Sequence, residues 1–492
     1  MGDDTQGAGT TEGTTLTEEA GPRPADQVGG LDAMFLNCET PTMHMHVCGL
    51  LILDPSETHV ADPYSAIRKM LETRLPGIAP MRRRLVTVPF NLGRPYWVEE
   101  AEIDIDRHFQ RVTVDAPGDD RALAAMAGRF ASVALRRDRP LWEMLFVEGL
   151  ADGKVALLAK MHHSSIDGVS GANLLGSLFD LTPEGVESEV EVRPTPTVAP
   201  RPLEMTGRAL LDRLETPVEI AKLIPSTVAS VVSGVWRMTT RKDKKGSGAV
   251  PFSAPRTSFN SAITADRSVA YVNVSLAEVK AVRAAFSCTV NDVITAIVAG
   301  TLRRYLSDND ELPERTLIAA EPVSVHGQVG DMAGNTKVSV MFSTLATDIE
   351  DPILRLQVIA EGNRRAKEIQ SLVGADTLMQ LTEHLWPNWI ALGARLYSSL
   401  DLADHHPVVH NLILSNVPGP PIPLYLAGAR LVGVYPLGPL MDGAGLNVTA
   451  LSEEKRIGFG FIASPQLVPD LWSMADLVPG ALAELVERIP AA

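Results

Sequence analysis

Cysteine is scarce in this chain of 492 residues, which contains only Cys38, Cys48 and Cys288. An odd number of cysteines without paired spacing disfavours a disulfide framework, and the sequence has no CxxC pair that would suggest zinc. This usage favours a reducing, cytosolic compartment.

Basic residues are also in the minority, because 44 Lys and Arg stand against 60 Asp and Glu and give a formal net charge of −16. This balance disfavours a polyphosphate-binding surface, so nucleic acid is not expected as a partner. Residues 1–29 lack the basic and apolar segments of a secretory signal and are expected to form a disordered tail. No uncharged apolar run reaches the roughly 18 residues that a spanning helix needs, so any membrane association is expected to be peripheral.

What remains is the composition of a folded protein, with 45% hydrophobic and 21% charged residues. The length predicts two domains. A stretch rich in Glu and Pro separates them, so we predict a first domain over residues 30–184, a linker with amphipathic helices over 185–254, and a second domain over 255–492.

Expected strands and helices are interleaved in both halves without a strict βαβ rhythm. This pattern favours an α/β fold of mixed sheets, or α+β, over a Rossmann or barrel fold. The Asp152-Gly153 pair predicts a hairpin, Pro76 ends a helix, and Asp119 and Asp120 cap the next. The first half is expected to contain strands over 45–53, 141–150 and 155–161 and helices over 61–75 and 119–135. The second half is expected to contain strands over 269–274, 337–342, 408–415 and 457–462 and helices over 276–285, 291–305 and 352–369.

His44 and His46 share one face of the first expected strand. They could be metal ligands, but no third ligand with suitable spacing lies nearby in the sequence. Packing is therefore the favoured interpretation of both side chains.

The most informative segment is MHHSSIDG, residues 161–168, which follows the strand over 155–161. Successive side chains of a strand point to opposite faces, so only one of His162 and His163 can face a cleft. A histidine with a pKa near the working pH can take a proton from a hydroxyl group during attack on a thioester. Ser164 and Ser165 lack the GxSxG elbow of a serine nucleophile.

A metal site made by His163 and Asp167 is disfavoured. Ligands four residues apart would need a continuous helix, which the preceding strand and Gly168 contradict. We therefore expect acid–base chemistry at this segment and no metal.

These residues resemble the HHxxxDG motif of the wax ester synthase/diacylglycerol acyltransferases, which belong to the superfamily of CoA-dependent acyltransferases and peptide-synthetase condensation domains. The resemblance extends from about Gly30 to the C-terminus and looks specific to the actinobacterial branch. Narrower matches are Pro140-Leu141-Trp142 with the PLW motif, Asn291-Asp292 with the ND motif, Ser415–Pro420 with the NVPGP segment, Arg82–Leu85, Trp97–Glu100 and Pro255–Asn260.

The resemblance implies two chloramphenicol-acetyltransferase-like domains with an active-site tunnel between them. His163 would be the general base and His162 a supporting residue. Asp167 would pair with an arginine and hold the loop. Gly168 would leave room where the backbone turns close to the site.

Substrate-binding roles are expected for Gly168, Asn291, Trp142, Leu141 and Pro140, with alternatives for Asn291 and Trp142. The amide of Asn291 could contact substrate or a developing oxyanion, or the residue could cap the helix that begins at Asp292. Trp142 could line the channel or pack in the core. The Asn416–Pro420 segment is expected to be a rigid turn.

The expected reaction is transfer of an acyl group from acyl-CoA to diacylglycerol, giving triacylglycerol, or to a fatty alcohol, giving a wax ester. Acyl-CoA would be a substrate, and neither a cofactor nor a metal is expected. The alternatives are a non-catalytic lipid-binding or droplet-associated paralogue and a condensation-type enzyme acting on another hydroxyl acceptor.

The expected location is cytoplasmic, peripheral to the inner face of the membrane or to lipid droplets. Apolar residues at helical spacing before a basic run make residues 225–245 a candidate interfacial helix. A helix that packs between the domains is the alternative.

Overall fold

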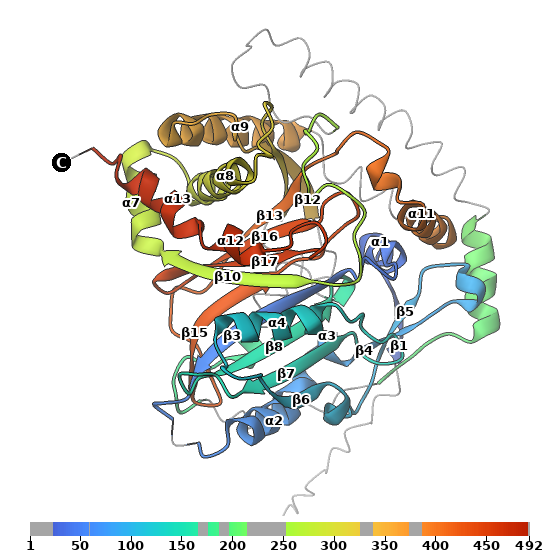
Figure 1. Cartoon of the computed structure of the whole chain (residues 1–492). Coiled ribbons are helices and arrows are strands. Elements are labelled where there is room, and N and C mark those ends of the chain that lie inside the picture. The colour runs from blue at the N-terminus through green and yellow to red at the C-terminus, as the bar shows by residue number, and fades with distance from the viewer. Residues whose placement is uncertain are drawn as a thin grey trace, which may run out of the picture.

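Two six-stranded mixed sheets form the core of the chain, and helices cover their faces (Figure 1). The structure, a computed structural model, describes residues 23–58, 60–165, 176–185, 196–213, 252–324, 338–372 and 386–490. The mixed α/β architecture expected from the sequence is confirmed.

The first sheet has the strand order β14-β15-β3-β8-β7-β6. Helix α2 covers one face through Ile67 and Leu71, and helix α4 covers the other through Leu123 and Ala127. The bounds are β3 (His46–Asp54), α2 (Pro63–Arg74), β6 (Phe109–Thr113), α4 (Asp120–Ala131), β7 (Trp142–Glu148), β8 (Val155–His162), β14 (Tyr425–Leu426) and β15 (Ala429–Leu437).

Local signals in the sequence explain several of these elements. The side chain of Asp119 accepts a hydrogen bond from the Ala122 amide at 2.8 Å and caps α4. Strands β7 and β8 pair antiparallel, and Gly153 in the turn between them has a φ of 75° that favours glycine. The predicted hairpin and cap are confirmed.

The second sheet has the order β10-β17-β16-β13-β11-β12. Helix α8 is its main cover, and Val293, Ile294 and Ile297 of that helix are completely buried. The bounds are β10 (Ser268–Ser275), α7 (Leu276–Phe286), α8 (Val290–Asp308), β11 (Ile318–Ser324), β12 (Val338–Thr344), α9 (Pro352–Leu372), β13 (Leu412–Pro418), β16 (Leu446–Glu453), β17 (Arg456–Ala463), α12 (Leu471–Ala475) and α13 (Val478–Val486).

Smaller elements lie around the two sheets. Strands β2, β5 and β4 form a three-stranded sheet, and β1 pairs with β9. Helix α11 packs against α1 (Figure 1). The bounds are β1 (Arg23–Pro24), β2 (Asp26–Gln27), α1 (Gly30–Cys38), α3 (Ala79–Arg82), β4 (Arg83–Val86), β5 (Tyr96–Glu99), β9 (Thr197–Val198) and α11 (Pro387–Ser399), with short 3-10 turns η1 (Leu75–Gly77), η2 (Pro89–Asn91), η3 (Ile105–Arg107), η4 (His163–Ser165) and η5 (Leu402–Asp404) and a helix over 202–213.

Residues 425–437, from the second half of the chain, return to the first sheet. Strand β15 pairs antiparallel with β3, from Arg430 opposite Asp54 to Leu437 opposite Cys48. The two sheets therefore do not divide the chain into two continuous segments, and the domain boundaries given above stay a prediction.

Two sequence-based expectations are wrong in detail. Residues 23–29 are not part of a disordered tail, because β1 and β2 pair with other strands and Ala25 is buried against Val88. Asn416–Pro418 are not in a turn but at the end of β13, paired with Ala450–Ser452. Strand β11 pairs only with the start of β13, so Pro418 lies where one side of the strand has no neighbour, and proline is tolerated there.

Within the described ranges, no single helix has the length and apolarity of a membrane span. Helices α7 and α8 have the length and apolarity of a span only when they are taken as one segment, and that segment is bent by 106° between them. Most of α8 is buried in the core, so its apolar character is accounted for by packing.

Candidate active site

The two adjacent histidines lie at the end of β8, where the backbone leaves the sheet. His162 is the last residue of the strand and pairs with His46 of β3. His163 begins the 3-10 turn η4, and its amide donates a hydrogen bond to the Met45 carbonyl at 2.9 Å. The regular alternation of a strand therefore ends at His162, and the turn determines where His163 points.

His162 is enclosed and held in one tautomer. Its Nδ1 accepts a hydrogen bond from the Ser164 amide at 3.1 Å, and the Ser164 hydroxyl lies 2.7 Å from the same atom. An amide can only donate, so Nδ1 is unprotonated and Nε2 has the proton in the neutral ring. Burial, together with the charges of Arg137 and His163, lowers the pKa of His162 to about 3.

Glu39 lies on the other side of the His162 ring, with Oε2 3.7 Å from Nε2. Arg137 forms an ion pair with this carboxylate and also donates to the Leu36 carbonyl at 2.5 Å. Burial nevertheless raises the pKa of Glu39, and Arg137 partly offsets that rise. His162 is thus a neutral, fixed ring, which suits a supporting residue.

His163 has a different environment. Its ring stacks on Phe35 of α1 with 4.2 Å between centroids and 29° between planes, and its buried Nδ1 has no hydrogen-bond partner among the described residues. Burial lowers the pKa of His163. A neutral imidazole held by a neighbouring ring has the protonation state that a general base needs.

Asp167 and Gly168 lie in residues 166–175, outside the described part of the chain. The expected role of Asp167 in holding the loop and that of Gly168 in leaving room beside the site stay predictions. The same applies to residues 225–245, the candidate interfacial segment.

Asn291 joins a polar group that connects α8, β11 and β13. Its Nδ2 donates to Glu321 Oε2 at 3.2 Å, and its Oδ1 accepts from Asn416 Nδ2 at 3.1 Å. Burial raises the pKa of Glu321, which is 5% exposed. Each polar atom of the amide therefore already has one protein partner, and contact with substrate stays a prediction.

The expectation that Asn291 caps its helix is wrong. The cap is Thr289, which exchanges hydrogen bonds with Asp292 in a capping box. A Thr three residues before an Asp is the sequence signal of this motif. Asn291 lies in the first turn of α8, where its side chain can reach β11 and β13.

Pro140, Leu141 and Trp142 are all buried in the first half of the protein. The Trp142 indole donates to the Met81 carbonyl at 2.8 Å and stacks on His108 at 4.3 Å between centroids. These are the contacts of core residues, and the substrate-binding role of the segment stays a prediction.

The carboxyl end of α4 is held by side chains from β3, β8 and the turn before β3. Lys160 Nζ donates to the Phe130 and Val133 carbonyls at 3.1 and 2.8 Å. His46 Nε2 contacts the Ala131 carbonyl at 2.9 Å, and His44 Nε2 contacts the Ser132 carbonyl at 3.0 Å. The packing interpretation of both histidines is confirmed, and the described residues contain no metal-binding cluster.

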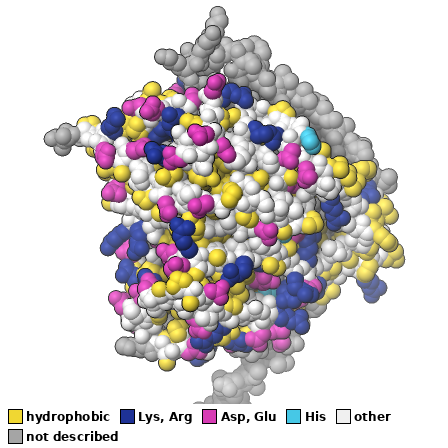
Figure 2. Space-filling model, in the orientation of Figure 1, with side chains coloured by type: hydrophobic (Ala, Val, Ile, Leu, Met, Phe, Trp, Pro, Cys, Tyr) yellow, Lys and Arg dark blue, Asp and Glu magenta, His cyan; other side chains and the backbone are white. Residues whose placement is uncertain are grey.

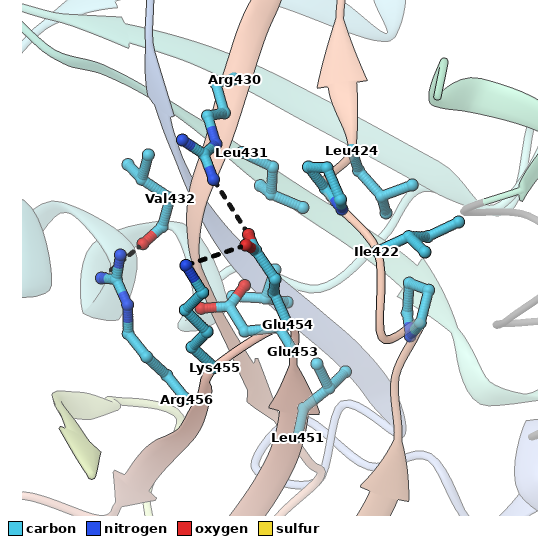
Figure 3. A pocket seen from close by; sticks show the side chains of 13 residues that line it. Ile422, Leu424, Arg430, Leu431, Val432, Leu451, Glu453, Glu454, Lys455 and Arg456 are labelled. Atoms are coloured by element: carbon cyan, nitrogen blue, oxygen red, sulfur yellow. Dashed lines mark hydrogen bonds and ion pairs between the residues drawn. The ribbon is translucent and has the colours of Figure 1, made fainter. Parts of the chain in front are cut away.

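A separate hollow of about 250 Å³ lies between the loop after β13, strand β15 and the β16–β17 hairpin (Figure 3). Its apolar floor includes Leu431 and Leu451, and burial raises the pKa of Glu453 on its wall to about 7. Arg430, on the rim of the hollow, lies opposite Asp54 in the pairing of β15 with β3. Asp54 is the last residue of β3, whereas the His46–His162 pair lies at the first residue of that strand. The hollow is therefore distinct from the histidine site.

The sequence did not single out Phe35, Glu39 or Glu321. Phe35 and Glu39 lie about 125 residues before the histidines and become neighbours only through the fold. Glu321 had a weak signal, because it is a lone carboxylate within an otherwise apolar strand.

Family models and similar proteins show which family the chain belongs to. The wax ester synthase/diacylglycerol acyltransferase catalytic domain matches residues 28–294, and the C-terminal domain of the same family matches residues 333–486. A Mycobacterium tuberculosis protein of strain CDC 1551, named as a diacylglycerol O-acyltransferase, is 37% identical over 472 residues, which cover 94% of this chain and 90% of that protein. Another from strain H37Rv with the same type of name is 33% identical over 468 residues, covering 93% and 98%.

Solved structures show the same relation. The wax ester synthase/diacylglycerol acyltransferase from Marinobacter aquaeolei VT8 is 30% identical, with a TM-score of 0.64 and coverage of 94% of this chain and 98% of that one. The first condensation domain of the CDA synthetase, 16% identical with a TM-score of 0.55 and coverage of 95% and 97%, shares the fold. The chain therefore belongs to the wax ester synthase/diacylglycerol acyltransferase family.

Proposed function

We propose that this chain transfers the acyl group of a long-chain acyl-CoA to the free hydroxyl of diacylglycerol and so makes triacylglycerol. The observation that carries the proposal is the imidazole of His163, whose pKa is lowered by burial and whose ring stacks on Phe35, in a member of this family. The names of the mycobacterial relatives and of the Marinobacter structure support the substrate class.

The step needs one base and no covalent intermediate. His163 takes the hydroxyl proton as the oxygen attacks the thioester carbonyl, and the carbon–sulfur bond then breaks. The resulting imidazolium returns the proton to the CoA thiolate. Holding both substrates in one water-poor site orients the attack and protects the thioester from hydrolysis.

A fatty alcohol is the second acceptor, because a general base recognises only the hydroxyl group. Wax ester synthesis would use the same residues. The proposed location is the cytoplasmic face of the membrane or a lipid droplet, where both acceptors are dissolved.

The purified protein should release thiol from palmitoyl-CoA only when an acceptor is present. Dioleoylglycerol and hexadecanol are compared, with free thiol and ester product measured together. Thiol release that equals ester formation supports direct transfer. No release with either acceptor would overturn the proposal in favour of a lipid-binding paralogue.

The pH profile provides an independent check of the base. Because burial lowers the pKa of His163 below its ordinary value of 6.5, the ring stays neutral down to lower pH than a free imidazole. We expect kcat/KM to be flat above pH 6.5 and to fall on the acid side, by about tenfold per pH unit once the pH is below the lowered pKa. A fall that begins well above pH 6.5 would contradict this assignment.

A further inference from the structure

Helix α11 presents a continuous apolar stripe to solvent. Trp389, Leu392, Leu396 and Leu400 follow one another at spacings of three and four residues along the helix and its last turn. Such spacing puts all four on one face. They are 65%, 46%, 47% and 57% exposed, so none of the described residues covers this face.

The opposite side of α11 is firmly attached to the protein. The helix packs against α1 (Figure 1), the Ser398 hydroxyl lies 2.9 Å from that of Thr42, and the Tyr397 hydroxyl lies 2.6 Å from His406 Nε2. The outward stripe is therefore held in place and is not the result of a loosely docked helix.

Two neighbouring elements extend the apolar surface. Asn388 of α11 donates to the carbonyl of Phe90, whose side chain is 88% exposed. The guanidinium of Arg213, at the end of the helix over 202–213, lies 5.0 Å from the ring of Trp386. We call the surface of Phe90, Trp389, Leu392, Leu396 and Leu400 the α11 face; the exposed Leu203, Leu210 and Leu211 belong to the neighbouring helix over 202–213.

The helix over 202–213 has apolar side chains on both of its sides. Met205 and Ala209 are buried against Val88, while Leu203 and Leu210 point outward and are 86% and 50% exposed. Figure 2 shows hydrophobic side chains with Lys and Arg among them along the edge where this helix lies in Figure 1. Exposed leucines on a helix that is already anchored by other residues indicate a second contact surface.

The charged residues of the two helices indicate what kind of partner this surface binds. Helix α11 has no acidic residue, and Arg395 is its single charge. The helix over 202–213 has two basic residues, Arg208 and Arg213, and two acidic ones, Glu204 and Asp212, with Arg208 paired to Glu204 at 2.6 Å. In a chain of net charge −16, helix α11, with its leucines, Trp389 and Arg395 and no acidic residue, has the chemistry of a helix that lies in an anionic lipid interface.

The α11 face is also connected to the candidate base. Helix α1 contacts both α11 and the turn η4, and Phe35 of α1 stacks on His163. One helix therefore separates the exposed stripe from the catalytic imidazole. We propose that the α11 face docks on an anionic phospholipid surface and brings the His163 site to acceptors dissolved there, a use of the surface that rests on the function proposed above.

Vesicle co-sedimentation tests the docking separately from the chemistry. The full chain is mixed with vesicles of phosphatidylcholine and phosphatidylglycerol, and with vesicles of phosphatidylcholine alone. We expect the double variant Trp389→Ser/Leu396→Ser to bind the anionic vesicles about tenfold more weakly than the unchanged chain. The unchanged chain should also bind phosphatidylcholine alone more weakly, because the attraction of the arginines is lost.

The matched control is Val340→Ser/Leu354→Ser, which removes two side chains of similar exposure, 49% and 50%, from β12 and α9. Its vesicle binding should not change. Transfer to dioleoylglycerol in vesicles should fall with binding in the α11 variant, whereas transfer to a short-chain alcohol in solution should not. If transfer is absent for every protein but the binding difference remains, the docking stands and the proposed function fails.

Two results would overturn the docking. One is unchanged vesicle binding by the Trp389→Ser/Leu396→Ser variant. The other is a dimer of the unchanged chain that this variant converts to a monomer in size-exclusion chromatography, since the stripe would then be an interface between two copies.

Discussion

Replacing His163 with alanine should lower kcat/KM for every hydroxyl acceptor by about 10²- to 10⁴-fold, the usual contribution of a general base. The loss should be the same for diacylglycerol and fatty alcohol, because the base acts on the hydroxyl they share. The ring stacks on Phe35 and is only partly buried, so the variant should stay folded. Steady-state transfer from palmitoyl-CoA and thermal melts measure the two effects.

The control is His162→Ala, whose effect should differ in kind. His162 is 1% exposed, with its Nδ1 bonded to Ser164, so its removal leaves a cavity and an unpaired amide. We expect a lower melting temperature and a smaller loss of turnover. A folded His163→Ala protein with near-normal turnover would show that the base lies elsewhere.

Replacing Lys160 with methionine should give the largest loss of stability, about 3 kcal/mol. The ammonium is 1% exposed and donates to two carbonyls at the end of α4, and it pairs with Glu143 Oε2 at 3.1 Å. Methionine fills the space but leaves the carboxylate and the carbonyls without a partner. Because the Glu143 side chain keeps 24% exposure, the loss should lie near the low end of the range for broken buried pairs.

Urea unfolding of three proteins tests this prediction. The double variant Lys160→Met/Glu143→Leu should recover part of the lost free energy of unfolding, since it no longer buries an uncompensated charge. Equal stability of Lys160→Met and the unchanged chain would mean that the ion pair and the carbonyl contacts contribute nothing net.

The elements that the sequence predicted correctly depend on local chemistry. The Asp152-Gly153 turn, the Asp119 cap and the helix before Pro76 each involve residues within a few positions of one another. The apolar run over 155–161, directly after that turn, likewise placed the two histidines at the end of a strand. Short-range signals therefore gave most of the helices and strands and the position of the candidate base.

The features that the sequence did not predict come from contacts between distant residues. Asn416 looked like part of a turn because Pro418 and Pro420 disfavour a strand, but pairing with β16 on one side compensates. The hydrogen bonds of Asn291 with Glu321 and Asn416 join positions 30 and 125 residues away. The spacing of hydrophobic residues along the sequence does not predict contacts between distant segments. The residues around the candidate base, including Phe35, could not be predicted for the same reason.

The return of β15 to the first sheet has a consequence for synthesis on the ribosome. Strand β3 takes β8 as one neighbour early, but its other neighbour is β15, which ends only at Leu437. Until that segment has left the exit tunnel, the nascent chain keeps an open sheet edge along β3, and open edges favour aggregation. A fragment that ends at the linker should therefore fail to behave as an independent domain, and the protein must be treated as one cooperative folding unit from the first strand to nearly the last.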